Sequence, residues 1–373
     1  MNIQRVREEF PITRNKVFLN HAGQSPPPKP VVDAMGGVME EFSEGGTVSA
    51  DLGEARRLFA RLIDAEAGEI ALVPNTSTGI NIIANMLDYP RGSNVVVTDL
   101  EFPSVVYPWL RAGLGVEVRY LKNVGGKILL GDVERAVDDR TAVVAISHVE
   151  YPNGFRHDLG SLAGIAHEHG AYLLVDAVQS AGAMQIDVRR DGVDFLAASC
   201  YKWMLGPSGA GFLYVRRELV EGFEPPFVGW ASVRPEVFET VDFWDIWDLK
   251  LSETASRFEV GSPSLVSFVG AAAALRLILD VGIEKIEGRI LGLTSHLIEG
   301  VKGLGFKLQT PEEEECRSGI VNFLIDDPQG WVERLGERGI IVSARAKGLR
   351  ASPHFYNTIK EIDCLLDELT LNR

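Results

Sequence analysis

Short apolar runs alternate with amphipathic stretches from Val17 to about Val215. The runs are rich in Val, Ile and Leu and lie at residues 70–73, 94–98, 116–120, 142–146, 171–175 and 210–215. Stretches with helical spacing, such as residues 162–169, lie between several of them. Strands that alternate with helices are typical of a largely parallel α/β sheet. Such sheets bind ligands at the carboxyl ends of their strands, where we expect Asp176 and the loop after Val73.

The pattern changes after about residue 222, where prolines and a Trp-rich segment at residues 243–247 predict an irregular connection. Beyond it, apolar spacing predicts helices and short strands in turn: helices at 265–279, 283–304 and around 331–337, and strands at 320–325 and 340–342. We therefore predict a large domain of residues 16–245. Residues 246–373 would form a smaller C-terminal α/β domain, on which residues 1–15 pack.

Charge and cysteine content narrow the class of protein. The 373 residues include 37 Lys and Arg against 52 Asp and Glu, a net charge of −15, which disfavours nucleic acid and anionic membranes as partners. The three cysteines are widely spaced and contain no CxxC pair, so neither a disulfide framework nor a metal site is expected. The first ten residues lack the apolar core of a signal peptide. We expect a soluble, cytoplasmic protein.

A lysine and an aspartate occupy unusual places in this pattern. Lys202 follows the apolar run 195–199 and precedes a Gly/Pro turn, so a short loop carries it toward the core. A partly desolvated lysine is nucleophilic enough to bind an aldehyde as a Schiff base. Asp176 ends a buried strand, and a buried charge requires a partner. A lysine that forms an imine and an aspartate that pairs a pyridinium nitrogen together meet the needs of pyridoxal 5'-phosphate.

Two further segments have both an ordinary and a functional interpretation. Residues 74–79, Pro-Asn-Thr-Ser-Thr-Gly, follow a strand and begin a helix. Their hydroxyl groups could simply cap the helix, or could bind a phosphate at its N-terminus. Arg350, near the end of the chain, could form a surface ion pair or bind a substrate carboxylate with two hydrogen bonds. Lys202 and Asp176 favour the phosphate interpretation of residues 74–79, and both interpretations of Arg350 stay open at this point.

These segments, taken together and in order, resemble the class V aminotransferases among the fold-type I pyridoxal-phosphate enzymes. That group includes cysteine desulfurases, kynureninase and isopenicillin N epimerase. The resemblance covers nearly the whole chain and rests on the segments 18–23, 75–79, 101–104, 147–154, 176–179, 199–202, 257–263 and 350–352. It implies a large domain built on a mainly parallel sheet of the seven-stranded type and a smaller C-terminal α/β domain. It also implies a homodimer with active sites at the interface.

The resemblance assigns roles to individual residues. Lys202 would hold the coenzyme as an internal aldimine, Asp176 would pair its ring nitrogen, and Gln179 would approach its phenolic oxygen. Phe102 would stack on the ring. The phosphate would be bound by hydroxyl groups of Thr76, Ser77, Ser199 and Tyr201, and by Ser262 of the other subunit. The substrate would meet Arg350 through its carboxylate, and also Ala22 and Tyr151.

Departures from the family pattern bear on the reaction. Desulfurases carry a cysteine on a mobile loop shortly before the carboxylate arginine, whereas residues 343–349 contain none. Cys364 lies beyond Arg350 in an expected helix. Tyr151 stands where desulfurases usually have asparagine. Persulfide formation by the usual route is therefore disfavoured.

We therefore expect a pyridoxal-phosphate enzyme that acts on an amino acid, with transamination as the leading reaction. A C–S lyase or desulfurase-like activity is second, and an epimerase is third. A catalytically silent relative that only binds a ligand would have been favoured by loss of Lys202 or Asp176, and both are present. A nicotinamide dehydrogenase would also have an α/β sheet, but no G-x-G-x-x-G follows the early strands.

Overall fold

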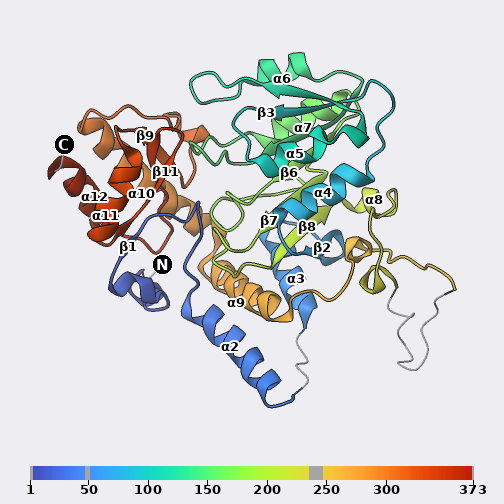
Figure 1. The fold of residues 1–373 in the computed structure, drawn as a ribbon, viewed down its shortest axis with the longest axis horizontal. Helices are drawn as coiled ribbons and strands as arrows, with labels where there is room; N and C mark the ends of the chain where they lie inside the picture. Colours follow the sequence, from blue (N-terminus) through green and yellow to red (C-terminus); the bar gives the residue numbers. More distant parts are fainter. Residues whose placement is uncertain (1–2, 47–50, 235–246, 372–373) are drawn as a thin grey trace.

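The computed structural model describes residues 3–46, 51–234 and 247–371, and a seven-stranded sheet forms the centre of its larger part (Figure 1). The strand order is β2-β8-β7-β6-β5-β3-β4. The strands are β2 (Ile70–Val73), β3 (Asn94–Thr98), β4 (Glu117–Leu121), β5 (Thr141–Ser147), β6 (Tyr172–Asp176), β7 (Phe195–Ser199) and β8 (Gly211–Val215). Strand β8 alone points opposite to the other six strands, since it pairs in an antiparallel way with both β2 and β7. The predicted α/β class with a mainly parallel sheet is confirmed.

Helices cover both faces of this sheet because its strands are apolar on both sides. On one face, Val95 and Val97 of β3 pack with α4 (Thr76–Met86) and α5 (Pro103–Leu110). On the other face, Val96 belongs to a larger core shared with helices that include α3, α6, α7 and α9. The helices around the sheet are α2 (Lys29–Ser43), α3 (Leu52–Leu62), α6 (Leu130–Ala136), α7 (Leu159–Glu168), α8 (Arg217–Val220) and α9 (Leu265–Val281).

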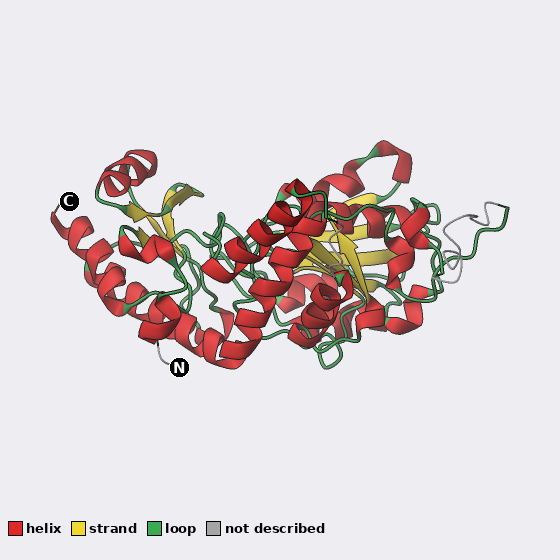
Figure 2. Cartoon of the chain, turned by 90° about the horizontal axis from the view of Figure 1, so that it is seen from below, coloured by secondary structure: helices red, strands yellow, loops and turns green. Residues whose placement is uncertain are grey.

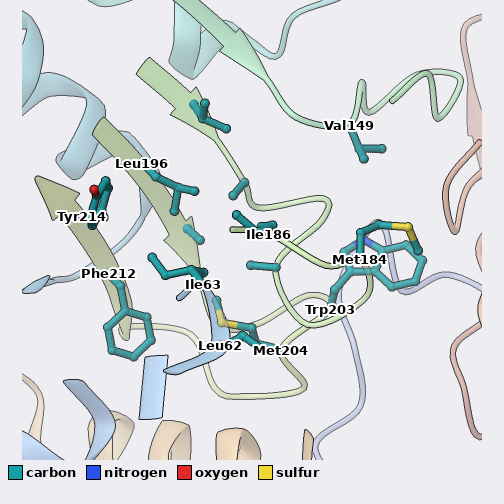
Figure 3. Close-up of a cluster of buried hydrophobic side chains, with 14 of the residues drawn as sticks. Leu62, Ile63, Val149, Met184, Ile186, Leu196, Trp203, Met204, Phe212 and Tyr214 are labelled. Atoms are coloured by element: carbon teal, nitrogen blue, oxygen red, sulfur yellow. The ribbon is translucent and has the colours of Figure 1, made fainter. Parts of the chain in front are cut away.

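The larger core reaches the connection between β7 and β8. Trp203 and Met204, which follow Lys202, are fully buried in it. Figure 3 shows Met204 beside Leu62 and Ile63, and Trp203 next to Met184, all members of the same core. The connection that carries Lys202 is therefore fixed by packing directly after the lysine.

A second, smaller sheet lies in the C-terminal part and has its own core. It has the strand order β11-β12-β9 and is antiparallel throughout, with β9 (Val321–Leu324), β11 (Ser343–Arg345) and β12 (Gly348–Ala351). Helices α10 (Ile283–Gly303), α11 (Pro328–Glu337) and α12 (Ile359–Leu371) accompany it. Figure 2, seen from below, separates the two groups of strands along the length of the molecule.

The N-terminal segment joins this C-terminal part. Strand β1 (Val17–Phe18) pairs in parallel with β10 (Ile340–Ile341), and Asn20 forms a bridge with Ser352. Helix α1 (Ile3–Arg7) lies nearby in Figure 1. Short 3₁₀ turns complete the described elements: η1 (Pro11–Arg14), η2 (Ala67–Glu69), η3 (Ala112–Leu114), η4 (Trp230–Ser232), η6 (Ala255–Phe258) and η7 (Glu314–Cys316).

The division into a domain of residues 16–245 and one of residues 246–373 with 1–15 stays a prediction. The limit between residues 245 and 246 lies outside the described residues, as does most of the Trp-rich segment. Helix α9, placed in the smaller domain by its position in the sequence, packs against α2 and α3. Among the described residues, no single helix is long and apolar enough to cross a membrane. Helices α9 and α10 pass such a test only as a pair bent by 80°.

Candidate active site

The carboxyl edge of the large sheet gathers the polar residues singled out in the sequence. Strands β5, β6 and β7 are parallel and end at Ser147, Asp176 and Ser199. Strand β2 points the same way, and α4 begins three residues after its end, at Thr76. Lys202 lies in the connection that leaves β7 at this edge. The strand order thus brings distant residues together, as expected for a ligand site in a sheet of this kind.

Lys202 and Asp176 have opposite charges and both are strongly affected by burial. Desolvation, helped by the charges of Arg350 and Arg345, lowers the pKa of Lys202 to about 8, and the attraction of Asp176 opposes this fall. Desolvation also raises the pKa of Asp176 to about 6, opposed by a hydrogen bond from the Val178 N–H and by Lys202. The site therefore contains a lysine that is partly uncharged near neutral pH and an aspartate that is mostly ionised there.

A cluster of hydroxyl groups lies at the N-terminus of α4. The Ser199 Oγ accepts a hydrogen bond from the Thr76 N–H at 2.7 Å, and the Thr76 hydroxyl lies 2.8 Å from the same oxygen. The Ser77 hydroxyl lies 2.7 Å from that of Ser104. Asn75 caps the helix by accepting from the Thr78 N–H. Gly79 lets α4 approach β7, since a Cβ there would lie 3.0 Å from that of Ala197. Backbone N–H groups and hydroxyls so arranged suit a phosphate.

Aromatic rings and a buried arginine complete the site around Lys202. The Lys202 Nζ lies 5.9 Å from the centroid of the Phe102 ring and 5.6 Å from that of Tyr201. The Phe102 ring, which is 46% exposed, meets the Tyr151 ring edge to face at 5.4 Å. The Tyr151 carbonyl accepts a hydrogen bond of 2.7 Å from Arg350. One chain of contacts thus joins the lysine to the arginine.

Arg350 is 1% exposed, and its two hydrogen bonds go to uncharged groups. Besides the Tyr151 carbonyl, it donates to the Ser343 hydroxyl at 3.2 Å. The ion pairs of the described residues do not include it. Desolvation, together with the charge of Arg345, lowers the pKa of Arg350 to about 9. A buried cation without a carboxylate is costly, and a bound anion would offset that cost.

Gln179 is held in one orientation by two fixed groups. Its Oε1 accepts a hydrogen bond of 2.8 Å from the Trp203 indole N–H, and its Nε2 donates to the Ala22 carbonyl at 3.0 Å. The Ala22 N–H in turn donates to the Ser352 hydroxyl. The second N–H of the Gln179 amide remains for a ligand, so Gln179 can act only as a donor there.

Ser262 does not join this cluster within one chain. It is exposed, has a φ of 40°, and lines a separate cavity of about 390 Å³ with Pro74 and Thr78. The surrounding motif has a structural use here: the Glu259 carboxylate accepts from Arg56 at 2.6 Å and from the Leu72 N–H at 2.9 Å. The cysteines lie in different surroundings: Cys200 is buried, Cys316 is partly buried and Cys364 is exposed.

Sequence reasoning missed several groups beside Asp176. Glu101 and Glu150 are both buried, and Glu101 accepts hydrogen bonds of 2.6 Å from both the N–H and the hydroxyl of Ser147. Trp203, the partner of Gln179, was also missed. The only signal in the sequence was that acidic residues follow apolar strands at 101 and 150. That signal does not distinguish a buried carboxyl from a solvated one.

Residues 17–365 match the family model described as Aminotransferase class-V. The chain belongs to this family. It is 33% identical to a probable cysteine desulfurase of Methanothermobacter thermautotrophicus, over 99% of this chain and 98% of that protein. It is 31% identical to an uncharacterized aminotransferase, YcbU, of Bacillus subtilis, over 98% and 97% of the two chains. The resemblance identified from the sequence is confirmed.

Solved structures agree with this class V assignment. The apo cysteine desulfurase of Thermococcus onnurineus NA1 has a TM-score of 0.87 at 29% identity and covers 98% of this chain and 96% of its own. The cystine C–S lyase C-DES, in complex with its reaction product cysteine persulfide, has a TM-score of 0.87 at 25% identity. It covers 96% of this chain and 98% of its own. Another C-DES structure, of a mutant in which a lysine is replaced by alanine, has glycine covalently linked to the PLP cofactor.

The class V enzyme uses pyridoxal phosphate, and the residues at the sheet edge fit that group. A lysine of lowered pKa faces a buried aspartate, as an aldehyde and a ring nitrogen require. The hydroxyl cluster at the start of α4 offers donors for a phosphate. When bound, the coenzyme supplies an electron sink for a substrate carbanion.

Proposed function

We propose that this class V enzyme cleaves the Cβ–S bond of cysteine or of its disulfide, cystine, by β-elimination. The observation that carries the proposal is the hairpin before Arg350. Strands β11 and β12 pair Arg345 with Gly348, so the turn consists of Ala346 and Lys347 alone. Both have positive φ, 49° and 64°, which gives a tight two-residue hairpin. This turn has no room for a loop with a sulfur-accepting cysteine.

Each residue of the site has a part in this reaction. Arg350 binds the substrate carboxylate and thereby fixes the Cα–H bond in the site. Lys202, with its pKa of about 8, removes the Cα proton as a general base. Asp176 keeps the ring nitrogen protonated, and Gln179 donates its free N–H to the phenolic oxygen. Thr76, Ser77, Ser199 and Tyr201 bind the phosphate, and Phe102 and Tyr151 enclose the substrate.

The overall reaction balances without any oxidant. L-Cysteine and water give pyruvate, ammonia and hydrogen sulfide, because the Cβ–S bond breaks with its electrons on sulfur. L-Cystine and water give pyruvate, ammonia and cysteine persulfide. A desulfurase would instead give alanine and leave sulfur on a protein thiol. The names of the relatives support sulfur chemistry, and the cysteine-free hairpin supports release of the sulfur.

Product analysis of the coenzyme-loaded enzyme with L-cysteine and L-cystine tests the proposal. Pyruvate and ammonia in equal amounts support β-elimination. Alanine in place of pyruvate would mean desulfuration, and would overturn the argument from the hairpin. Appearance of the D-isomer would mean epimerisation, and no turnover of any amino acid would support a silent relative.

Transamination, the leading expectation from the sequence, remains a second proposal because one relative at 31% identity is named an aminotransferase. It predicts that an amino acid yields its keto acid without free ammonia, and that a second keto acid is needed for turnover. The same product analysis separates the two proposals, since only elimination releases ammonia.

We also propose that the enzyme is a homodimer. Ser262 is exposed and stands apart from the hydroxyl cluster of its own chain, so a role at a phosphate requires a second copy. Sedimentation would give the mass of the assembly. Ser262→Ala should then weaken coenzyme binding without changing that mass.

A further inference from the structure

Arg345 lies on the same face of the small sheet as Arg350. In the register of β11 and β12, Ser343 is opposite Arg350, and residues opposite each other in an antiparallel pair point to the same side. Arg345 follows Ser343 by two positions on β11, so it also points to that side. The two arginines are therefore diagonal neighbours, whose positions are about 7–8 Å apart and within reach of long side chains.

The face that carries both arginines is turned toward the loop after β5, whereas the opposite face belongs to the core of the C-terminal part. Arg350 donates to the Tyr151 carbonyl of this loop. Asn322 of β9, which is opposite Arg350 in the register, donates to the Pro152 carbonyl at 2.7 Å. The same amide group donates to the Arg345 carbonyl at 3.1 Å. The backbone of Arg345 is therefore tied to a loop of the candidate active site.

The guanidinium of Arg345 bonds to an uncharged group. Arg345 is exposed, and its Nη1 donates to the carbonyl of the preceding residue, Ala344, at 2.7 Å. No carboxylate forms an ion pair with it in the described part of the chain. An arginine can bind a carboxylate with two parallel hydrogen bonds that are stronger than those to a neutral carbonyl. A bound carboxylate would therefore replace the Ala344 carbonyl as the partner of Arg345.

Arg345, Arg350 and Lys202 form a group of cations at the candidate active site. The charges of both arginines act on Lys202, and the charge of Arg345 also acts on Arg350. Asp176 acts on Lys202 with the opposite sign. In the proposed function the α-carboxylate of the substrate pairs with Arg350. The charge of Arg345 then remains for a second anion on the same substrate molecule.

We propose that Arg345 binds a carboxylate at the far end of the substrate side chain, so that the enzyme acts on an S-substituted cysteine with an acidic substituent. This substrate class rests on the proposed function, which provides the scissile Cβ–S bond. Cystine is a member of the class, because its second half ends in a carboxylate, whereas cysteine has no second acid. When the Cβ–S bond breaks, its electrons stay on sulfur, and the leaving thiolate or persulfide retains the acidic group. The other half and water give pyruvate and ammonia, so no oxidant or reductant is needed.

The first test measures binding to the coenzyme-loaded enzyme by calorimetry, with ligands that have no amine and therefore cannot react. 3,3'-Thiodipropionate has the skeleton of S-(2-carboxyethyl)cysteine without its amino group, and its monoamide has nearly the same shape with one charge fewer. The wild type should bind the diacid about tenfold more tightly than the monoamide, because a charge-assisted hydrogen bond replaces a neutral one. Arg345→Met should bind both ligands equally, and Arg345→Lys should keep part of the preference.

Lys347→Met is the matched control for this binding test, because it removes a positive charge from the same hairpin. Lys347 stands in the turn and lines a separate cavity of about 740 Å³ with Trp331. This variant should keep the preference of the wild type for the diacid. Equal affinities of the wild type for the two ligands would overturn the role of Arg345. An equal loss of preference in Arg345→Met and Lys347→Met would also overturn it, since the effect would then come from net charge alone.

The second test compares the turnover of S-(2-carboxyethyl)-L-cysteine with that of its amide, S-(2-carbamoylethyl)-L-cysteine. In the wild type the KM of the acid should be about tenfold lower than that of the amide. Arg345→Met should remove this difference with little change in kcat, as loss of a binding contact implies. Equal KM values in the wild type would refute the role of Arg345, even if both compounds release pyruvate. If the diacid binds as expected and neither compound releases pyruvate, the proposed Cβ–S cleavage is wrong and the second carboxylate site stands.

Discussion

Replacing Arg350 by methionine should stabilise the coenzyme-free protein while abolishing its capacity to bind carboxylates. The arginine is 1% exposed and bonded only to the Ser343 hydroxyl and the Tyr151 carbonyl. The fall of its pKa from 12.5 to about 9 corresponds to roughly 5 kcal/mol against the charged form. Loss of the two hydrogen bonds should cost the variant about 1–3 kcal/mol of this gain, and imperfect packing of methionine about 1 kcal/mol more. We expect Arg350→Met to raise the free energy of unfolding by roughly 2 kcal/mol.

The buried charge of Arg350 also predicts how the free energy of unfolding changes with pH. Below pH 9 the folded wild type carries the full cost of the buried charge. Between about pH 9 and pH 12 the unfolded chain binds more protons at Arg350 than the folded one, so the wild type gains stability as pH rises. Arg350→Met should lack that gain.

Urea unfolding of the coenzyme-free proteins measures both effects. Lys347→Met is the matched control, because Lys347 is exposed in the turn of the same hairpin and should change the midpoint little. Adding 3-mercaptopropionate, a thiol carboxylate without an amine, should raise the midpoint of the wild type but not that of Arg350→Met. A lower midpoint for Arg350→Met than for the wild type would refute the view that this charge is held at a cost.

Three further results are expected. The rate at which the coenzyme attaches to Lys202 should rise with pH to a plateau above about pH 8. Asp176→Asn should move this rise to lower pH, because the charge of Asp176 raises the pKa of Lys202. An unchanged pH profile in this variant would contradict the electrostatic coupling of Asp176 to Lys202. Trp203→Phe should free the Gln179 amide to rotate and lower kcat several-fold with little change in KM, as steady-state kinetics would measure. Ser199→Ala should lower the free energy of unfolding of the coenzyme-free protein by about 1–3 kcal/mol, because the buried N–H of Thr76 loses its acceptor. The urea midpoint should fall accordingly, and an unchanged midpoint would argue against that hydrogen bond.

The sequence predicted the sheet and its principal polar residues because both depend on local pattern. Asp176 and Ser199 stand where an apolar strand ends, and Lys202 stands three residues later. Strand ends of a parallel sheet share an edge, so their chemistry could be placed together before any coordinates existed. The small shifts, such as β4 at 117–121 instead of 116–120, reflect hydrogen bonding at strand ends that apolar patterns do not specify.

Other features depended on contacts between distant segments. The burial of Glu150 requires Thr98, 52 residues before it, and the orientation of Gln179 requires Trp203 and Ala22. A pattern of apolar and polar positions has no information on such pairings. The tight hairpin before Arg350 was expected only as a short segment, since its turn residues, Ala346 and Lys347, are not typical of positive φ.

The pairing of β1 with β10 has a consequence for the order in which the enzyme is made. Val17 can pair only after Ile340 has been synthesised. The loop that orients Gln179 can be fixed only after Ser352 has been synthesised, because the Ser352 hydroxyl binds the Ala22 N–H. During synthesis the large sheet can form as soon as β8 has emerged, whereas the N-terminal loop has no template until almost the whole chain has been translated. Contacts of such long sequence separation form late and slowly. The nascent chain therefore has a lysine and an aspartate in place long before it has a finished catalytic site.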